Sequence, residues 1–260
     1  MRARRGAKAA ADPPIVLSEH GGVRYLHFGS HWIQGAMRVR RPDALVFEYV
    51  QRLCAWLLFL EPPQRLAQFG LGAGSLARWS LARLPDTRTT TVECSAAVIE
   101  CAHARFALPR AHPRLDVVHA DAEAFARAPA NRGAFGALQV DVYDAAARGP
   151  ALDSAAFYAG CRALLGGPAA VATFNLFNEA ASLAPNRDRI ARAFDGRVLA
   201  LPPLPAGNVI LIALAGPRLR VDADSLRARA RVVRERYGLP AERWAALLLD
   251  AHGADGVLRV

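Results

Sequence analysis

Glycines or carboxylates follow four successive strand-like runs of the chain, where they could hold a ligand or move a proton. A glycine turn follows the first run, Glu93 ends the second, Asp121 follows the third, and Asp141 and Asp144 follow the fourth. Carboxylates accept hydrogen bonds from sugar hydroxyls, take protons from amines and pair with cations. Any one of these acids alone would be an ordinary loop residue, and Asp121 stands where it could cap the next helix. Taken together, they predict a ligand site at one edge of a sheet.

The glycine turn contains Gly70, Gly72 and Gly74 and leads into a helix-like run. A strand, such a turn and a helix place backbone N–H groups and a helix N-terminus beside a ligand, and glycine lets the ligand approach the backbone. Because Glu93 closes the next strand, where it could hold a ribose diol, the pattern indicates a nucleoside or dinucleotide site. The spacing differs from the G-x-G-x-x-G of dinucleotide binders, which disfavours NAD. The alternative is an ordinary β–turn–α corner with Glu93 in solvent.

The elements that must position these residues alternate along the chain from Arg65 onward. Alternating strand-like and helix-like runs are typical of a mainly parallel sheet covered on both faces. The last two strands, joined by a short Pro/Gly connection, are expected to run antiparallel. We expect strands at 66–69, 89–92, 115–119, 137–142, 169–175, 198–201 and 209–215, and helices at 76–84, 96–106, 123–128, 154–165, 186–194, 225–237 and 242–250.

The residues before this alternation predict a small separate sheet and one long helix. Three short β-rich runs, 15–17, 23–28 and 32–37, are broken by glycines, and a helix over 44–60 follows Pro42-Asp43. The fold class is therefore α/β, a seven-stranded, mainly parallel sheet with a small N-terminal β-hairpin domain. We expect a disordered basic tail at 1–13, the N-terminal β-domain at 14–41 and the α/β domain at 42–260.

Composition and charge exclude several classes of function. The chain has 260 residues, of which 53% are hydrophobic, enough for a large core, while its longest early apolar run, 55–60, is too short to span a bilayer. Its formal net charge of +10 comes almost wholly from scattered arginines, since Lys8 is the only lysine, and this argues against nucleic-acid binding. No apolar signal core follows the basic start, which predicts a cytoplasmic protein. The cysteines and histidines lack metal-ligand spacing, so we expect buried, reduced thiols and no metal.

Short motifs then follow one another in an order that one enzyme family shares. They are Trp32-Ile33-Gln34, Phe47-Glu48-Tyr49, Gly70 to Leu76, Val92-Glu93, Ala120-Asp121-Ala122, Asp141 to Asp144 with Gly149-Pro150, Ser154 to Tyr158, and Leu164 to Pro168. In type and order they resemble the spermidine synthase (polyamine aminopropyltransferase) family, and the resemblance covers residues 22–215. It implies a class I methyltransferase-like, Rossmann-like fold.

The resemblance also implies a reaction and a set of site residues. The donor would be decarboxylated S-adenosylmethionine, the acceptor a polyamine-type amine, the assembly a homodimer, and no metal would be needed. Asp141 would be the base that takes a proton from the attacking amine, and Asp144, Tyr49 and Tyr143 would anchor the acceptor. The residues implied in binding the donor nucleoside are Gln34, Gly70, Gly72, Gly74, Glu93, Asp121, Ala122 and Pro150.

The chain departs from the family pattern at four places. Ala73 replaces an acidic residue that contacts the amine of the donor in the family, Val50 replaces His or Gln, Ala145 replaces proline, and Asn208 stands where an aromatic residue is expected. Two alternatives therefore stay open beside aminopropyl transfer. One is methyl transfer from S-adenosylmethionine on the same fold, and the other is a non-catalytic nucleoside-binding protein.

Overall fold

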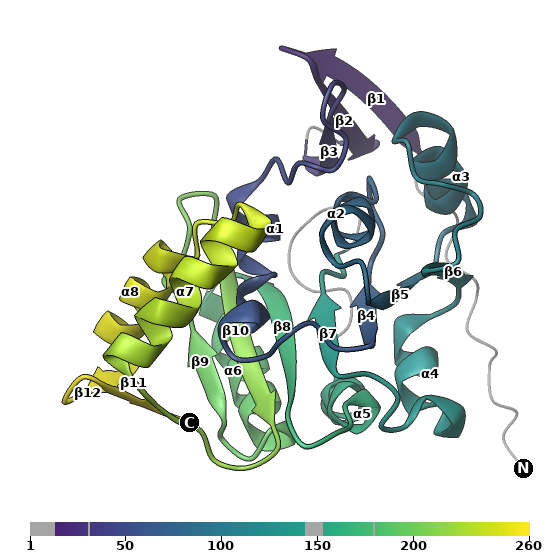
Figure 1. The fold of residues 1–260 in the computed structure, drawn as a ribbon. Coiled ribbons are helices and arrows are strands. Elements are labelled where there is room, and N and C mark those ends of the chain that lie inside the picture. The colour runs from purple at the N-terminus through teal and green to yellow at the C-terminus, as the bar shows by residue number, and fades with distance from the viewer. Residues whose placement is uncertain (1–13, 31, 144–152, 179) are drawn as a thin grey trace, which may run out of the picture.

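A seven-stranded sheet forms the centre of the protein in a computed structural model, which describes residues 14–30, 32–143, 153–178 and 180–260. The strand order is β6-β5-β4-β7-β8-β10-β9 (Figure 1). Strands β4 to β8 are parallel, whereas β10 runs antiparallel to both of its neighbours. The predicted fold class and the antiparallel end of the sheet are confirmed. The strands are β4 (Arg65–Phe69), β5 (Arg88–Glu93), β6 (Leu115–His119), β7 (Ala137–Val140), β8 (Ala170–Phe177), β9 (Val198–Ala200) and β10 (Asn208–Ala215).

Helices cover both faces of this sheet because its strand residues alternate between two apolar clusters. Leu66 packs with residues of α2, α7 and α8, whereas the next residue, Ala67, packs with residues of α4, α5 and α6 on the other face. Strands buried on both faces are typical of doubly wound sheets. The α-helices are α1 (Glu48–Arg52), α2 (Ser75–Arg83), α3 (Ala96–Arg105), α4 (Ala122–Arg127), α5 (Ala155–Leu164), α6 (Ala180–Ala193), α7 (Ala223–Tyr237) and α8 (Ala241–His252), with short 3-10 helices η1 (Ala55–Leu58) and η2 (Pro129–Asn131).

A separate antiparallel sheet lies above α2 and α3 (Figure 1). It consists of β1 (Ile15–His20), β2 (Val23–Phe28) and β3 (Ile33–Arg38) in that order. Two side-chain hydrogen bonds join it to the main body: Ser75 Oγ donates to the Ala36 carbonyl at 2.9 Å, and Arg24 Nη1 donates to the Arg105 carbonyl at 2.6 Å. The three predicted N-terminal strands are present, and they lie over the glycine turn.

The long helix expected over 44–60 was a wrong prediction. The structure instead has the short helix α1 and the 3-10 helix η1, separated by Leu53 and Cys54. The carbonyl of Leu53 accepts hydrogen bonds from Gln139 Nε2 at 3.1 Å and Thr173 Oγ1 at 2.8 Å. Because side chains from β7 and β8 take this carbonyl, the chain leaves the α-helical hydrogen-bond pattern there, and Leu57 N donates to Cys54 O instead.

Three smaller expectations also need correction. Helix α6 begins before Pro185, not after it, and buried Asn186 accepts hydrogen bonds from Tyr158 and Arg189, contacts that hold the helix through the proline. Cys94 is exposed, since it follows the last residue of β5, whereas the other three free cysteines are buried. A third sheet near the C-terminus was not predicted; it contains β11 (Arg220–Asp222), β12 (Gly253–Ala254) and β13 (Val257–Arg259).

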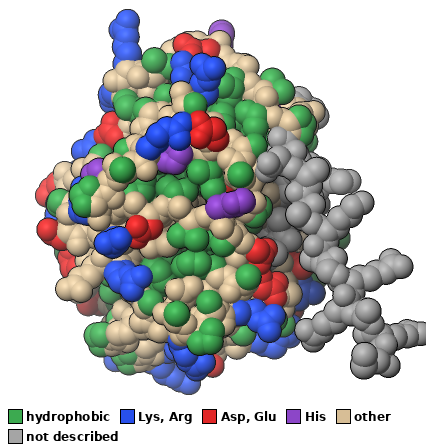
Figure 2. Space-filling view, turned by 90° about the vertical axis from the view of Figure 1, so that its right-hand side faces the viewer, with side chains coloured by type: hydrophobic (Ala, Val, Ile, Leu, Met, Phe, Trp, Pro, Cys, Tyr) green, Lys and Arg blue, Asp and Glu red, His purple; other side chains and the backbone are tan. Residues whose placement is uncertain are grey.

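The surface shows how the many arginines are distributed. On the face drawn in Figure 2, basic side chains lie among acidic and apolar ones instead of forming a stripe. Many arginines pair with a nearby carboxylate, as in Arg88 with Asp116 and Arg83 with Asp43. None of the helices that the structure describes is long and apolar enough to cross a bilayer.

Candidate functional site

The glycine turn between β4 and α2 brings two strand ends close together. Gly70, Gly72 and Gly74 have φ values of 88°, 49° and 70°, in the left-handed region that favours glycine. A Cβ on Gly70 would lie 2.1 Å from the carbonyl oxygen of Asp141, so only glycine lets the end of β4 approach the residue that follows β7. The turn therefore sets the distance between the predicted nucleoside site and the predicted base.

Glu93, at the end of β5, lies against this turn. Its Oε2 accepts a hydrogen bond from the backbone N–H of Leu71 at 3.0 Å, and its Oε1 accepts one from Ser95 N–H at 3.0 Å. The side chain is half-buried. Oε1 also accepts a hydrogen bond from Cys94 Sγ at 3.5 Å, so Oε2 is the oxygen that keeps capacity for a hydroxyl of a ligand. The structure therefore brings Glu93 and the glycine turn together, as the sequence predicts.

Strand β3 lies over the turn and carries Gln34. A Cβ on Gly35 would come within 2.7 Å of the backbone nitrogen of Ala73, and one on Gly72 would lie 3.0 Å from the carbonyl oxygen of Gln34. The Nε2 of Gln34 is buried and has no hydrogen-bond partner among the residues that the structure describes. A buried amide left unpaired is costly in a folded protein, so this group is available to a ligand at the turn.

Asp121 and Ala122 follow β6 on the other side of Glu93. Asp121 caps α4, since its Oδ1 accepts a hydrogen bond from Ala124 N–H at 2.7 Å, which is the alternative that the sequence left open. Its side chain is exposed, and with Glu123 and Arg127 it lines a surface hollow of about 480 Å³. The contribution of Asp121 and Ala122 to adenine binding stays a prediction.

Asp141 lies at the end of β7 in a network of amides. Asn175 Nδ2 donates to Asp141 Oδ1 at 2.8 Å, and Asn208 Nδ2 donates to Asn175 Oδ1 at 3.1 Å. Burial raises the pKa of Asp141 to about 6, while the hydrogen bond from Asn175 acts in the opposite direction. A carboxyl group with this pKa is ionised at neutral pH yet close to the range in which it can exchange a proton.

Two tyrosines border the same carboxylate. Burial raises the pKa of Tyr49 well above 10, and electrostatic interactions with Asp141 and Tyr143 raise it further. The pKa of Tyr143 is also raised by burial and by Asp141, and its hydroxyl donates to the carbonyl of Asn175 at 3.1 Å. Both phenols are therefore neutral at physiological pH. The structure thus brings Tyr49, Tyr143 and Asp141 together, as predicted.

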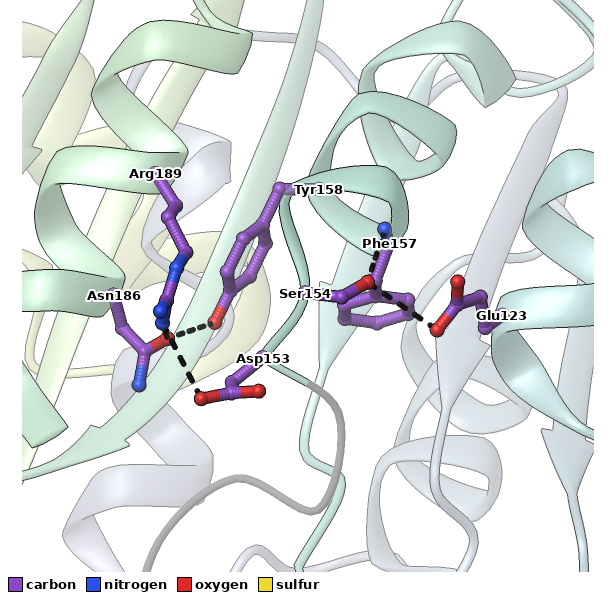
Figure 3. Close-up of polar contacts among 7 residues, drawn as sticks. All are labelled: Glu123, Asp153, Ser154, Phe157, Tyr158, Asn186 and Arg189. Atoms are coloured by element: carbon purple, nitrogen blue, oxygen red, sulfur yellow. Dashed lines mark hydrogen bonds and ion pairs between the residues drawn. The ribbon is translucent and has the colours of Figure 1, made fainter.

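Asp144 and Pro150, together with Ala145, lie outside the described residues. Asp153 and Ser154, which follow that segment, each make a polar side-chain contact with a neighbouring helix, as Figure 3 shows. Arg189 Nη1 on α6 contacts Asp153 Oδ2 at 3.3 Å, and Ser154 Oγ donates to Glu123 Oε2 at 3.3 Å. Ser154 also caps α5 by accepting from Phe157 N–H at 2.9 Å. These contacts fix the start of α5 beside α4 and α6.

Sequence reasoning missed Asn175 and gave Asn208 no role. Asn175 is 3% exposed and is the last residue of the strand expected over 169–175. A polar residue at the carboxyl end of a buried strand, next to a strand that ends in a carboxylate, was the available signal. Asn208 was noted only as the replacement of an aromatic residue, and its contact with Asn175 depends on the antiparallel pairing of β8 and β10.

Comparison with known proteins finds relatives that match most of the chain. The chain is 33% identical over 245 residues to a polyamine aminopropyltransferase of Neisseria meningitidis serogroup A, covering 94% of this chain and 92% of the relative. It is 32% identical over 238 residues to a polyamine aminopropyltransferase of Chromobacterium violaceum, covering 91% and 90%. No model of a protein family matches the chain.

Solved structures share the fold at lower sequence identity. A probable spermidine synthase from Corynebacterium glutamicum superposes with a TM-score of 0.68 at 18% identity, and 95% of each chain is covered. Human methyltransferase-like protein 13 in complex with SAH gives 0.63 at 19% identity, covering 74% of this chain and 93% of that one. A spermidine synthase in complex with the transition-state analogue AdoDATO gives 0.57 at 18% identity, covering 78% and 74%. These likenesses support the class I methyltransferase-like fold.

Proposed function

The chain belongs to the polyamine aminopropyltransferase family, and we propose that it transfers an aminopropyl group from decarboxylated S-adenosylmethionine to a polyamine-type amine. One observation carries the proposal. Asp141, with its pKa raised to about 6, lies beside the glycine turn and is bordered by two neutral phenols. An acceptor amine needs a base and uncharged hydrogen-bonding groups at the same place, and this cluster offers both.

The donor would lie along the edge formed by the ends of β4, β5 and β6. Glu93 would accept hydrogen bonds from the ribose hydroxyls, because its Oε2 lies against the turn and keeps acceptor capacity, and the weak donor Cys94 Sγ–H on Oε1 could give way to a hydroxyl. The unpaired Nε2 of Gln34 would donate to the nucleoside from above the turn. Asp121 and Ala122 would border the adenine, and the resemblance also implies Pro150 in donor binding. The AdoDATO and SAH complexes of the structural neighbours support an adenosyl-type donor.

The reaction would be an in-line displacement at the carbon beside the sulfonium of the donor. The acceptor nitrogen forms a bond to that carbon as the carbon–sulfur bond breaks, and the bonding pair stays on sulfur, which becomes a neutral thioether. The acceptor amine is an ammonium ion at neutral pH, so it must first lose a proton to free the lone pair that attacks. The carboxylate of Asp141 accepts this proton, and the hydrogen bond from Asn175 holds Asp141 in one orientation while it does so.

The tyrosines would hold the acceptor in line with the donor carbon. Tyr49 and Tyr143 are neutral hydroxyl groups beside Asp141, so they can hydrogen-bond an amine without adding charge. Asp144 would bind the cationic end of the acceptor, as the resemblance implies. An acidic pocket in a basic protein suits a polycation, because the field of the pocket outweighs that of scattered surface arginines at short range.

One observation favours methyl transfer as a second candidate. Ala73 is 2% exposed and packs with Leu26, Met37 and Phe106 under the N-terminal sheet. The turn therefore gives no carboxylate at this position to the ammonium of an aminopropyl tail. Methyl transfer from S-adenosylmethionine is therefore the second candidate function. Binding of a nucleoside without any reaction is the third.

A transfer assay with purified protein tests the proposal. The protein is incubated with each donor and a panel of amines, and mass spectrometry measures the mass gained by the amine. Aminopropyl transfer by the parent, with strong loss in Asp141→Asn, supports the proposal. Methyl transfer would favour the second candidate, and binding of the nucleoside by calorimetry without any transfer would favour the binding protein. A homodimer, a cytoplasmic location and the domain boundary at residue 41 stay predictions.

A further inference from the structure

Arg78, on α2 just behind the glycine turn, is buried, and in the described part of the chain its hydrogen bonds go to backbone carbonyls and not to a carboxylate. Its side chain is 5% exposed. Its Nε donates to the carbonyl of Pro42 at 2.7 Å, and its Nη1 donates to the carbonyls of Ala73 and, at 2.7 Å, Phe106. No hydrogen-bond partner for its Nη2 lies among the residues that the structure describes. One guanidinium group thus bonds to three backbone carbonyls.

These three carbonyls belong to segments that border the donor site from different sides. Ala73 lies in the glycine turn, and Pro42 lies in the link that follows β3, the strand with Gln34. Phe106 directly follows α3, the helix after Glu93. Arg78 gives the link, the turn and the end of α3 one shared hydrogen-bonding group. Arg78 therefore connects the segments that carry the predicted nucleoside contacts.

Burying the charged side chain of Arg78 costs the protein free energy of desolvation. Burial lowers its pKa to about 10, and the more distant Asp43 offsets part of this shift. The group remains charged at neutral pH, so the fold keeps a cation away from water with carbonyl dipoles as its nearest partners. Buried charges without a paired ion are unfavourable and are retained where they serve a purpose. The planar fork of arginine carries five N–H donors in fixed directions, which suits carbonyls that lie on different sides of it.

We propose that Arg78 is a positioning residue for donor binding, which docks the N-terminal sheet and its Gln34 against the glycine turn. The identity of the ligand rests on the proposed function, whereas the coupling between sheet and turn does not. Arg78 touches neither donor nor acceptor in this proposal. It acts by fixing how far Gln34 lies from the turn and from Glu93.

Arg114 provides a control for Arg78. It stands just before β6 and contacts the C-terminal end of α2, whereas Arg78 lies near the N-terminal end of that helix. Its Nη1 donates to the carbonyl of Leu84 at 2.7 Å and its Nη2 to that of Leu81 at 2.9 Å. Like Arg78, Arg114 donates side-chain hydrogen bonds to backbone carbonyls. These carbonyls lie at the C-terminal end of α2, away from the glycine turn. Arg114→Met removes a similar set of bonds without loosening the donor site.

The test compares Arg78→Met, Arg78→Lys and Arg114→Met with the parent. Calorimetry measures the Kd of decarboxylated S-adenosylmethionine and of methylthioadenosine, urea unfolding measures stability, and hydrogen exchange without ligand follows β3 and the turn. We expect both methionine variants to lose stability. Only the Arg78 variants should bind both ligands more weakly. We expect the Kd to rise by about tenfold or more in Arg78→Met and by less in Arg78→Lys, which keeps one or two hydrogen bonds. They should also speed exchange in β3 and the turn, and the KM for the amine should change by less than about twofold.

Three results would overturn the inference. Arg78→Met could fold and bind donor as the parent does, Arg114→Met could weaken donor binding equally, or exchange in β3 and the turn could be unchanged in the Arg78 variants. If Arg78→Met does not fold, Arg78→Lys decides by the same measurements. A parent that binds neither nucleoside would refute the proposed function, and the exchange measurement would still decide the coupling.

Discussion

Replacing Asp141 by Asn should make the folded protein more stable and the enzyme nearly inactive. Burial raises the pKa of Asp141 from 3.8 to about 6, so the ionised form is disfavoured in the folded chain by about two units. At about 1.4 kcal/mol per unit, this costs up to about 3 kcal/mol of stability at pH 7. The side chain is only half-buried and the new amide must find its own partner, so we expect a net gain of about 1 kcal/mol.

The pH dependence gives this prediction a definite sign. Between about pH 4 and pH 6, folded Asp141 holds a proton that the unfolded chain has released, so the parent loses stability as the pH rises through this window. Asp141→Asn cannot ionise and avoids that loss. The gain of the variant over the parent should be complete at pH 7 and vanish near pH 4. Urea unfolding at several pH values measures it.

The control is Glu93→Gln. Glu93 accepts hydrogen bonds from two backbone N–H groups, so neutralising it should bring no gain in stability at pH 7.

Turnover of Asp141→Asn should fall by about 10²-fold or more, the usual scale for a positioned base, with donor binding nearly unchanged. A variant that is less stable at pH 7, or that turns over near the parent rate, would refute the reasoning and leave Asp141 a structural residue.

Three further outcomes follow from the site. Glu93→Ala should weaken donor binding by roughly 2 kcal/mol because the ribose loses a charged partner, and unchanged affinity in calorimetry with intact folding would remove Glu93 from the site. Asn175→Leu removes the hydrogen bond that lowers the pKa of Asp141, so the acid limb of turnover should move up by about one unit from its parent position near pH 6, and an unmoved profile of kcat/KM against pH would contradict this. Gly70→Ala places a Cβ 2.1 Å from the carbonyl of Asp141 and strains a φ of 88°, so we expect at least about tenfold lower turnover, and a parent-like rate would show that the turn does not position Asp141.

The sequence predicted the sheet and the turn well because their signals are local. The alternation of apolar runs, the glycines after Phe69 and the acid after Val92 each specify their structure within a few residues. Strand β6 and the pairing of the last strands matched the expectation closely. The same locality explains why the sequence predicts Glu93 beside the turn.

The failures depend on contacts between residues far apart in the chain. The helix expected over 44–60 has suitable apolar residues, but Gln139 and Thr173 take the carbonyl of Leu53 and end it early. Asn175 joins the site because β8 lies beside β7 and because Asn208 Nδ2 on β10 donates to its Oδ1, although the residue opposite Asn208 in the strand register is Phe177. Hydrophobic periodicity carries no information about such side-chain hydrogen bonds, so the break at Leu53 was not predictable, whereas the only signal for Asn175 was its place at the end of a buried strand.

The hydrogen bonds to the Leu53 carbonyl also constrain the order in which the chain folds. Their donors, Gln139 and Thr173, come 86 and 120 residues later in the chain, so they leave the ribosome long after Leu53. Helix α1 has five residues, too few to be stable alone. We therefore expect the segment that carries Tyr49 to stay unstructured until β7 and β8 have joined the sheet. The acceptor side of the site would then be completed late in synthesis, whereas the glycine turn and Glu93 need only the early strands β4 and β5.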